Sequence, residues 1–299
     1  MHQSALLCLV LSSLLTWGNE APAAHESATT AVPSKPKPAS KPVAAKPAKP
    51  LFTSTVAPSE AAKPAAHAAH EEDPNHWSYE GKLTGPANWA RINPAYGLCA
   101  EGQAQSPVNV DKAQLQKLEP LKITYGLSKL AILNNGHTIQ VNVEPGSWLE
   151  ALGERYELKQ FHFHTPSEEA INGRRFPLVA HMVHASESGS LAVIAVLFKE
   201  GRANPTLDAL WPRLPEEHGE TRSYSERVLS PASLLPDNLR FFTLKGSLTT
   251  PPCSEEVRWL ILKTPLELSS AQLERFRQFF PMNARPLQAL NGREILESE

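Results

Sequence analysis

The 27 prolines of this 299-residue chain are unevenly distributed, which limits where a compact fold can form. Ten of them fall within residues 21–74, a segment that also contains 16 Ala and 6 Lys. Proline fixes φ and lacks a backbone N–H, so prolines at this density interrupt both helices and sheets. The segment also has too little apolar surface to offset the entropy lost on ordering. We therefore expect an extended linker over 21–74 and one folded domain over 75–299.

Residues 1–20 have the pattern of a secretory signal peptide. The apolar stretch over residues 5–15 has the length of a signal-peptide core, and Ala-Pro-Ala at 21–23 offers a small-residue cleavage site near 20–24. We therefore expect an exported protein, periplasmic or secreted. The apolar runs are shorter than the roughly 18 residues that span a bilayer, which predicts no transmembrane segment. A formal net charge of -2 provides no basic excess for nucleic acid.

The domain pattern is dominated by strands. Residues 191–199 form a nearly continuous apolar run, typical of a strand buried on both faces. Residues 137–143 and 157–164 alternate, residues 176–184 and 255–263 also favour strands, and Asn172-Gly173 suits a tight hairpin turn. Helical patterns are confined to the region after Asn204 and to residues 269–280, where Ser269 or Ser270 would cap. The prediction is a sheet-dominated α+β fold in a single domain with a few surface helices.

Histidines on the predicted strands form a candidate metal site. Because strand side chains alternate, His162 and His164 share a face, and His181 on the next predicted strand can join them. Three neutral imidazoles with an open fourth position make a catalytic zinc site. Two alternatives remain at this point. The histidines could be core groups with satisfied hydrogen bonds, or His162, His164 and Glu168 could bind a metal with the ligand spacing of a cupin.

Motifs along nearly all of residues 75–299 resemble the α-class carbonic anhydrases. In chain order they are HWSYEG at His76, GPANW at Gly85, QSPVNV at Gln105, NNGHTIQV at Asn134, QFHFHTPSE at Gln160, HMVH at His181, LAVIAV at Leu191, GSLTTPPCSEEVRW at Gly246 and NARPLQALNGR at Asn283. The resemblance implies a ten-stranded, largely antiparallel twisted sheet and reversible hydration of carbon dioxide to bicarbonate. The TPSE after the histidines, together with Cys99 and Cys253, looks like the bacterial exported branch of the family. Two cysteines far apart in an exported domain also suggest a disulfide, and that branch pairs the positions of Cys99 and Cys253.

The resemblance assigns the chemistry to individual residues. His162, His164 and His181 would bind zinc, and hydroxide on the metal would attack carbon dioxide. Thr249 would accept a hydrogen bond from this hydroxide and donate its own to Glu168, which would then orient the nucleophile without binding metal. The apolar substrate pocket and its border would be formed by Val183, Val193, Leu248, Thr250 and Trp259.

Further positions would support the reaction. His137 matches the proton shuttle of the family, and a solvent-facing imidazole with a pKa near 6.5 exchanges protons at little cost with zinc-bound water of pKa near 7. Gln160 and Asn283 would accept hydrogen bonds from the rings of His162 and His164, through a side chain and a backbone carbonyl respectively. Tyr79 matches a position that contacts ordered water in the cavity.

Three departures from the family pattern cluster behind the third histidine. Val179 stands where the family has Glu, Glu169 where it has His, and Leu244 where it has Tyr. A zinc-bound imidazole needs an acceptor on its other nitrogen, and valine offers none. We hypothesise that Glu169 accepts this hydrogen bond from His181 instead. The alternative is a weakened metal site.

Two other function classes remain to be compared with a zinc lyase. A carbonic-anhydrase-like binding module with weakened chemistry would fit display on a long linker, although all three ligand positions are histidine. A cupin-like metalloprotein would place Glu168 on the metal. For the enzyme we expect carbon dioxide and bicarbonate as substrates, Zn²⁺ as cofactor, and a monomer or homodimer.

Overall fold

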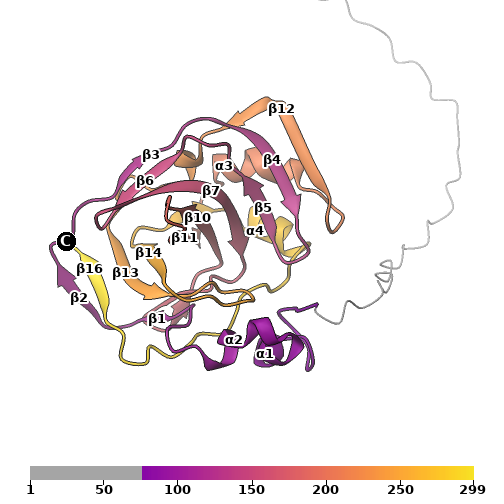
Figure 1. Cartoon of the computed structure of the whole chain (residues 1–299). Coiled ribbons are helices and arrows are strands. Elements are labelled where there is room, and N and C mark those ends of the chain that lie inside the picture. Colours follow the sequence, from indigo (N-terminus) through magenta and orange to yellow (C-terminus); the bar gives the residue numbers. More distant parts are fainter. Residues whose placement is uncertain (1–75) are drawn as a thin grey trace, which may run out of the picture. The chain divides into compact units, whose positions relative to one another are not determined.

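The computed structural model describes residues 76–299, so the predicted signal peptide (1–20) and linker (21–74) lie outside the described residues (Figure 1). Strands dominate this part of the chain. The longest helix in it, α4 (Ser270–Arg277), has eight residues. None of the helices in this range is long and apolar enough to cross a membrane.

The architecture is a large twisted sheet of thirteen strands, ten of which follow one another in an unbroken hydrogen-bonded order. That order is β12 (Thr221–Leu229), β4 (Ser128–Asn134), β5 (Ile139–Asn142), β7 (Glu154–His164), β10 (Leu178–Ala185), β11 (Leu191–Glu200), β14 (Val257–Leu262), β13 (Phe241–Gly246), β16 (Ile295–Ser298) and β2 (Ala113–Gln116). Off this path lie β3 (Lys122–Thr124), β6 (Trp148–Ala151) and β15 (Leu266–Leu268). Pairs are antiparallel except β11–β14, β11–β15 and β16–β2. The predicted sheet-dominated, largely antiparallel fold is therefore confirmed.

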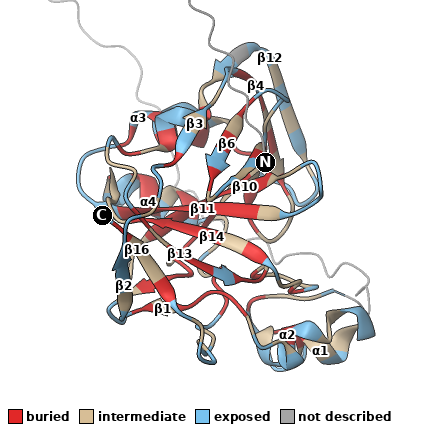
Figure 2. Ribbon diagram, turned by 60° about the vertical axis from the view of Figure 1, so that its left-hand side comes forward, coloured by how far each residue is buried: buried red, intermediate tan, exposed pale blue. Residues whose placement is uncertain are grey.

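The central strand, β11, is buried on both faces, as expected. Along β11, alternate residues such as Ile194 and Val196 enter the main apolar core, while Val193 and Leu197 enter a second core on the other face. In Figure 2, red marks the buried residues along β10, β11 and β14. Because both faces are covered, the sequence of this strand is apolar without alternation.

Two strand predictions need correction. The strand expected over 137–143 begins only at Ile139, because the backbone N–H groups of His137 and Thr138 both donate to Asn135 Oδ1 in a turn. The Asn172-Gly173 turn does have positive φ at both residues, as a tight hairpin requires. However, it joins β8 (Ala170–Ile171) to β9 (Arg174–Arg175) in a small separate sheet that also contains β1 (Asn109–Val110). The chain then re-enters the main sheet as β10, beside β7.

The two predicted helical regions are present. Asn204 caps α3 (Pro205–Leu210), which a 3-10 turn over Trp211–Arg213 extends. Ser269 caps α4 in a reciprocal capping box with Gln272. A further 3-10 turn spans Pro231–Leu234.

Short helical turns precede the sheet and are tied to it by a disulfide. They comprise two 3-10 turns (Pro86–Asn88 and Pro94–Tyr96), α1 (Trp89–Ile92) and α2 (Leu98–Glu101). Cys99 in α2 is bonded to Cys253, 154 residues later, and both pack with Tyr79 and Trp89 in a small apolar cluster. The predicted Cys99–Cys253 disulfide is confirmed, and it anchors the turn between β13 and β14.

Candidate metal centre

Strand register brings the three histidines together. His162 on β7 lies directly opposite His181 on β10, and His164 follows His162 on the same face of β7. One ring nitrogen from each lies within 4.8 Å of the other two, and within residues 76–299 this is the one cluster of its kind. The pairing follows from strand geometry, because directly opposed residues of antiparallel strands project to the same side.

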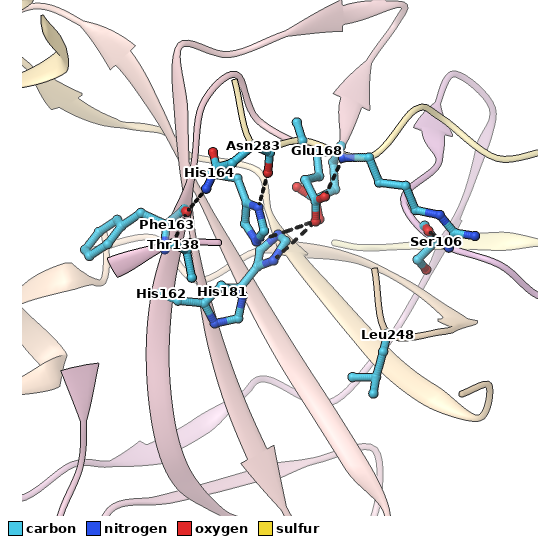
Figure 3. Close-up of polar contacts among 12 residues, drawn as sticks. Ser106, Thr138, His162, Phe163, His164, Glu168, His181, Leu248 and Asn283 are labelled. Carbon is cyan, nitrogen blue, oxygen red and sulfur yellow. Dashed lines mark hydrogen bonds and ion pairs between the residues drawn. The ribbon is translucent and has the colours of Figure 1, made fainter. Parts of the chain in front are cut away.

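Each imidazole is oriented by an acceptor on its outer nitrogen, and Figure 3 shows this contact for His164 and Asn283. His162 Nδ1 lies 2.8 Å from Gln160 Oε1, and His164 Nδ1 lies 2.7 Å from the backbone oxygen of Asn283. His181 Nε2 lies 2.8 Å from Glu169 Oε1. Because these oxygens can only accept, each outer nitrogen carries the proton, and the opposite nitrogen presents a lone pair.

The electrostatic environment favours neutral rings at His162 and His164. Burial, followed by the neighbouring histidines, holds the pKa of His162 well below its ordinary value. Burial also lowers the pKa of His164, although Glu168 opposes this. Burial disfavours charge on His181 as well, but the attraction and hydrogen bond of Glu169, together with the attraction of Glu168, outweigh it and raise the pKa of His181. The inner nitrogen of His164 is buried without a hydrogen-bond partner among the described residues. An electron-pair donor placed in this way fits a metal ion.

Glu168 is fully buried behind the histidines. Its Oε1 accepts a hydrogen bond of 2.8 Å from the backbone N–H of Arg285. Its Oε2 lies 3.6 Å from His164 Nε2 and 3.8 Å from His181 Nδ1. The expected hydrogen bond from Thr249 to Glu168 is not present among the described residues. The carboxylate oxygen that would accept it faces the two rings instead.

An apolar wall adjoins the histidines. Val183, Val193 and Trp259 lie opposite one another on β10, β11 and β14, so their side chains form a row on the face that carries His181. The ring of Trp259 meets that of His181 edge-on, with centroids 4.9 Å apart. Leu248, which is partly buried, packs against the same cluster. The residues predicted to line the pocket are thus brought together beside the histidine cluster.

The turn that carries Leu248, Thr249 and Thr250 is held from several directions. The backbone N–H of Leu248 donates to Ser254, and that of Cys253 donates to Thr250. The disulfide to Cys99 then ties this turn to α2.

His137 lies in a different environment from the one predicted. Its ring stacks on Trp77 with centroids 3.7 Å apart and lies 5.5 Å from the ring of His76. Burial, then His76 and His218, lower its pKa to about 4. The ring is only partly open to solvent, because Trp77 covers one of its faces.

Tyr79 lies between His137 and His164. Its ring is edge-on to His164 at 6.3 Å and to His137 at 6.5 Å. Its hydroxyl is buried without a hydrogen-bond partner among residues 76–299. Burial and the nearby Glu168 raise the pKa of Tyr79 well above its ordinary value, so the hydroxyl stays protonated and can donate.

Comparison with known proteins identifies the family. A family model described as eukaryotic-type carbonic anhydrase matches residues 84–299. The chain belongs to the α-carbonic anhydrases. Members of this family are zinc enzymes that hydrate carbon dioxide reversibly, with proton transfer by a shuttle group, and this chain is therefore a zinc-dependent carbonate dehydratase.

Individual relatives agree with this assignment over most of their length. A carbonic anhydrase from Pectobacterium carotovorum is 43% identical over 229 residues, which cover 76% of this chain and 93% of the relative. One from Neisseria gonorrhoeae is 42% identical over 235 residues, covering 78% and 90% respectively. The solved α-carbonic anhydrase from Thermovibrio ammonificans, in complex with sulfanilamide, has a TM-score of 0.71 at 42% identity. It covers 74% of this chain and 98% of the solved one.

Sequence reasoning missed three residues near this carbonic anhydrase site. Arg285 is buried, holds Glu168 through its backbone, and donates from its guanidinium to Gln105, Ser106 and Cys99. Trp77 covers His137, and His218 packs against Gly136. Arg285 lies within the NARPLQALNGR motif, so the motif could have indicated it. The other two contacts join segments that no local pattern connects.

Proposed function

We propose that His162, His164 and His181 hold the zinc through their inner nitrogens. The observation that carries this proposal is the set of three outer-nitrogen hydrogen bonds, which leaves three lone pairs within 4.8 Å of one another. When bound, zinc lowers the pKa of a coordinated water to about 7, the value known for this family, and so supplies a nucleophile at neutral pH.

We also propose that the wall beside the histidines binds carbon dioxide. The substrate has no net dipole, so apolar side chains can hold it without leaving polar groups unpaired. Val193 and Trp259 form the base of this wall, Val183 and Leu248 its partly exposed rim, and Thr250 its border. Burial of the wall keeps bulk water from the position where the substrate lies.

Glu168 has an orienting role in this proposal. Arg285 fixes one oxygen of its carboxylate. The other oxygen, which has no hydrogen-bond partner among the described residues, would turn from the two rings to accept a hydrogen bond from the Thr249 hydroxyl. An oriented hydroxyl would then accept but not donate toward the nucleophile. Glu168→Gln should therefore retain zinc while hydration slows. Loss of zinc in this variant would instead support a metal-ligand role, as in the cupin interpretation.

His137 is proposed to receive the proton that hydration releases. A neutral imidazole is the accepting form, but a pKa of about 4 makes acceptance of the proton unfavourable at pH 7. Covering by Trp77 makes the protonated form less stable, which should make turnover sensitive to buffer.

We propose export for this chain, with a signal peptide over 1–20, a linker over 21–74 and the catalytic domain over 75–299. The Cys99–Cys253 disulfide supports an oxidising compartment such as the periplasm. Sequencing the amino terminus of the mature protein would test the cleavage site. Light scattering would test the expectation of a monomer or homodimer.

The central experiment measures zinc content and carbon dioxide hydration on the same purified mature protein. We expect about one zinc per chain. His162→Ala and His181→Ala should lose both zinc and activity, and a variant that keeps its full zinc would remove that residue from the ligand set. Zinc without hydration activity in the unmodified protein would favour the binding-module alternative.

A further inference from the structure

Val179 cannot orient the third histidine. It lies on β10 two residues before His181, on the same face of the strand, and is fully buried in the apolar cluster that contains Leu244 and Trp259. None of these side chains carries a carboxylate. A ring N–H directed into such surroundings needs an acceptor from another element, because a buried unpaired donor is costly.

Glu169 supplies that acceptor. Its Oε1 lies 2.8 Å from His181 Nε2, and the side chains of Glu169 and His181 are 2% and 1% exposed. A carboxylate buried to this degree is stable only when it is paired. The second oxygen of this carboxylate, Oε2, is buried without a hydrogen-bond partner among the described residues. The pairing with His181 is therefore the main reason for a carboxylate to be here.

The segment that carries Glu169 is held in place by Ser167. The Ser167 hydroxyl donates to the backbone oxygen of Glu169 at 2.6 Å and accepts from the backbone N–H of Phe176 at 2.9 Å. The backbone N–H of Ser167 donates to the oxygen of Phe176 at 2.8 Å. These contacts join the segment after β7 to the segment just before β10, so the position of Glu169 does not depend on its own side chain alone.

Two consecutive carboxylates then divide between the two nitrogens of one ring. Glu169 contacts Nε2 of His181, and Glu168 Oε2 lies 3.8 Å from Nδ1 on the opposite side. Rotating the ring to exchange its nitrogens would break the buried hydrogen bond to Glu169. The ring is therefore fixed with Nδ1 toward His162 and His164.

We infer that Glu169 is the positioning residue for His181, and that the loop over residues 165–169, not strand β10, controls how firmly this enzyme retains zinc. This inference rests on the proposed zinc site. It also predicts that a carboxylate at position 179, where Val179 now lies, could accept the same hydrogen bond from His181 and retain the zinc.

The rate of zinc release tests the inference when the carboxylate is removed from position 169 or moved to position 179. The dissociation half-time of zinc into excess dipicolinate is measured for the mature protein, together with its melting temperature. Glu169→Ala should shorten the half-time about 10–100-fold, and Glu169→Gln, which keeps an accepting oxygen, should shorten it less. Ser167→Ala should shorten it as well. Glu267→Ala, which removes a partly exposed carboxylate paired with Arg202, is the matched control and should not change it.

The double variant Val179→Glu/Glu169→Ala separates orientation of His181 from general damage to the loop. It should retain zinc at least several-fold longer than Glu169→Ala alone, because the carboxylate returns beside His181 from the strand. A half-time for Glu169→Ala within twofold of the unmodified protein would overturn the inference. So would a folded double variant that releases zinc as fast as Glu169→Ala. Absence of zinc from the unmodified protein would instead overturn the proposed metal site itself.

Discussion

His137 should be a poor proton acceptor while its ring lies against Trp77. Its pKa falls from 6.5 to about 4 because of burial and the nearby His76 and His218. At pH 7 a group with a pKa of 6.5 is about one quarter protonated, whereas a pKa of about 4 leaves roughly one molecule in a thousand protonated. Solvent around the partly exposed ring screens such shifts. Even half of this shift leaves only about 2% protonated.

The pKa of the proton donor determines how far this low pKa of His137 slows turnover. The released proton comes from a group with a pKa near 7, so transfer to a ring with a pKa about three units lower is uphill by ~4 kcal/mol. A dissolved buffer with a matched pKa has no such barrier. We therefore expect imidazole to stimulate turnover of the unmodified enzyme several-fold in an otherwise weak buffer at pH 7. The value of kcat/KM should not change, because proton export follows the chemical step.

Stopped-flow hydration with increasing imidazole would measure this effect, with His137→Ala as the comparison. His137→Ala should have lower turnover in weak buffer and should approach the unmodified enzyme at saturating imidazole. His76→Ala removes one neighbour that lowers the pKa of His137, so it should reduce the stimulation. A His137 ring that titrates near 6.5 by NMR, in an enzyme whose turnover imidazole does not change, would refute the reasoning.

Three further measurements test other parts of the structure. Opening the Cys99–Cys253 disulfide should lower the melting temperature, since closing a 154-residue loop stabilises by up to ~5 kcal/mol in the chain-entropy model; two free thiols in the native exported protein would contradict this. Burial lowers the pKa of His184 from 6.5 to about 4, so the unfolded state binds this proton first and stability should fall by up to ~3 kcal/mol as the pH drops from 6.5 to 4. Urea unfolding of His184→Leu should show a weaker pH dependence over that interval, and an unchanged one would remove His184 as the cause. Glu168→Gln should keep about one zinc per chain while turnover falls about 10–100-fold, and unchanged turnover would exclude the orienting role.

Much of the site was accessible from the sequence because strand periodicity is local. Alternation along residues 157–164 places His162 and His164 on one face whatever the rest of the fold does. The apolar run at 191–199 likewise predicted a strand covered on both sides. The motif order then indicated the family, and with it the partners of each histidine. The proline-rich composition of 21–74 limited the predicted fold to the remainder of the chain.

Only the tertiary structure decided contacts between segments distant in sequence. Trp77 covers His137 across 60 residues, and Arg285 holds Glu168 across 117. Such contacts depend on how elements pack, and no short sequence period records them. The hydroxyl of Thr249 could be placed by motif, but its hydrogen bond depends on which way a buried carboxylate turns. Glu169 combines both cases: its adjacency to Glu168 is visible in the sequence, whereas its contact with His181 exists because β7 and β10 pair and the loop between them folds back.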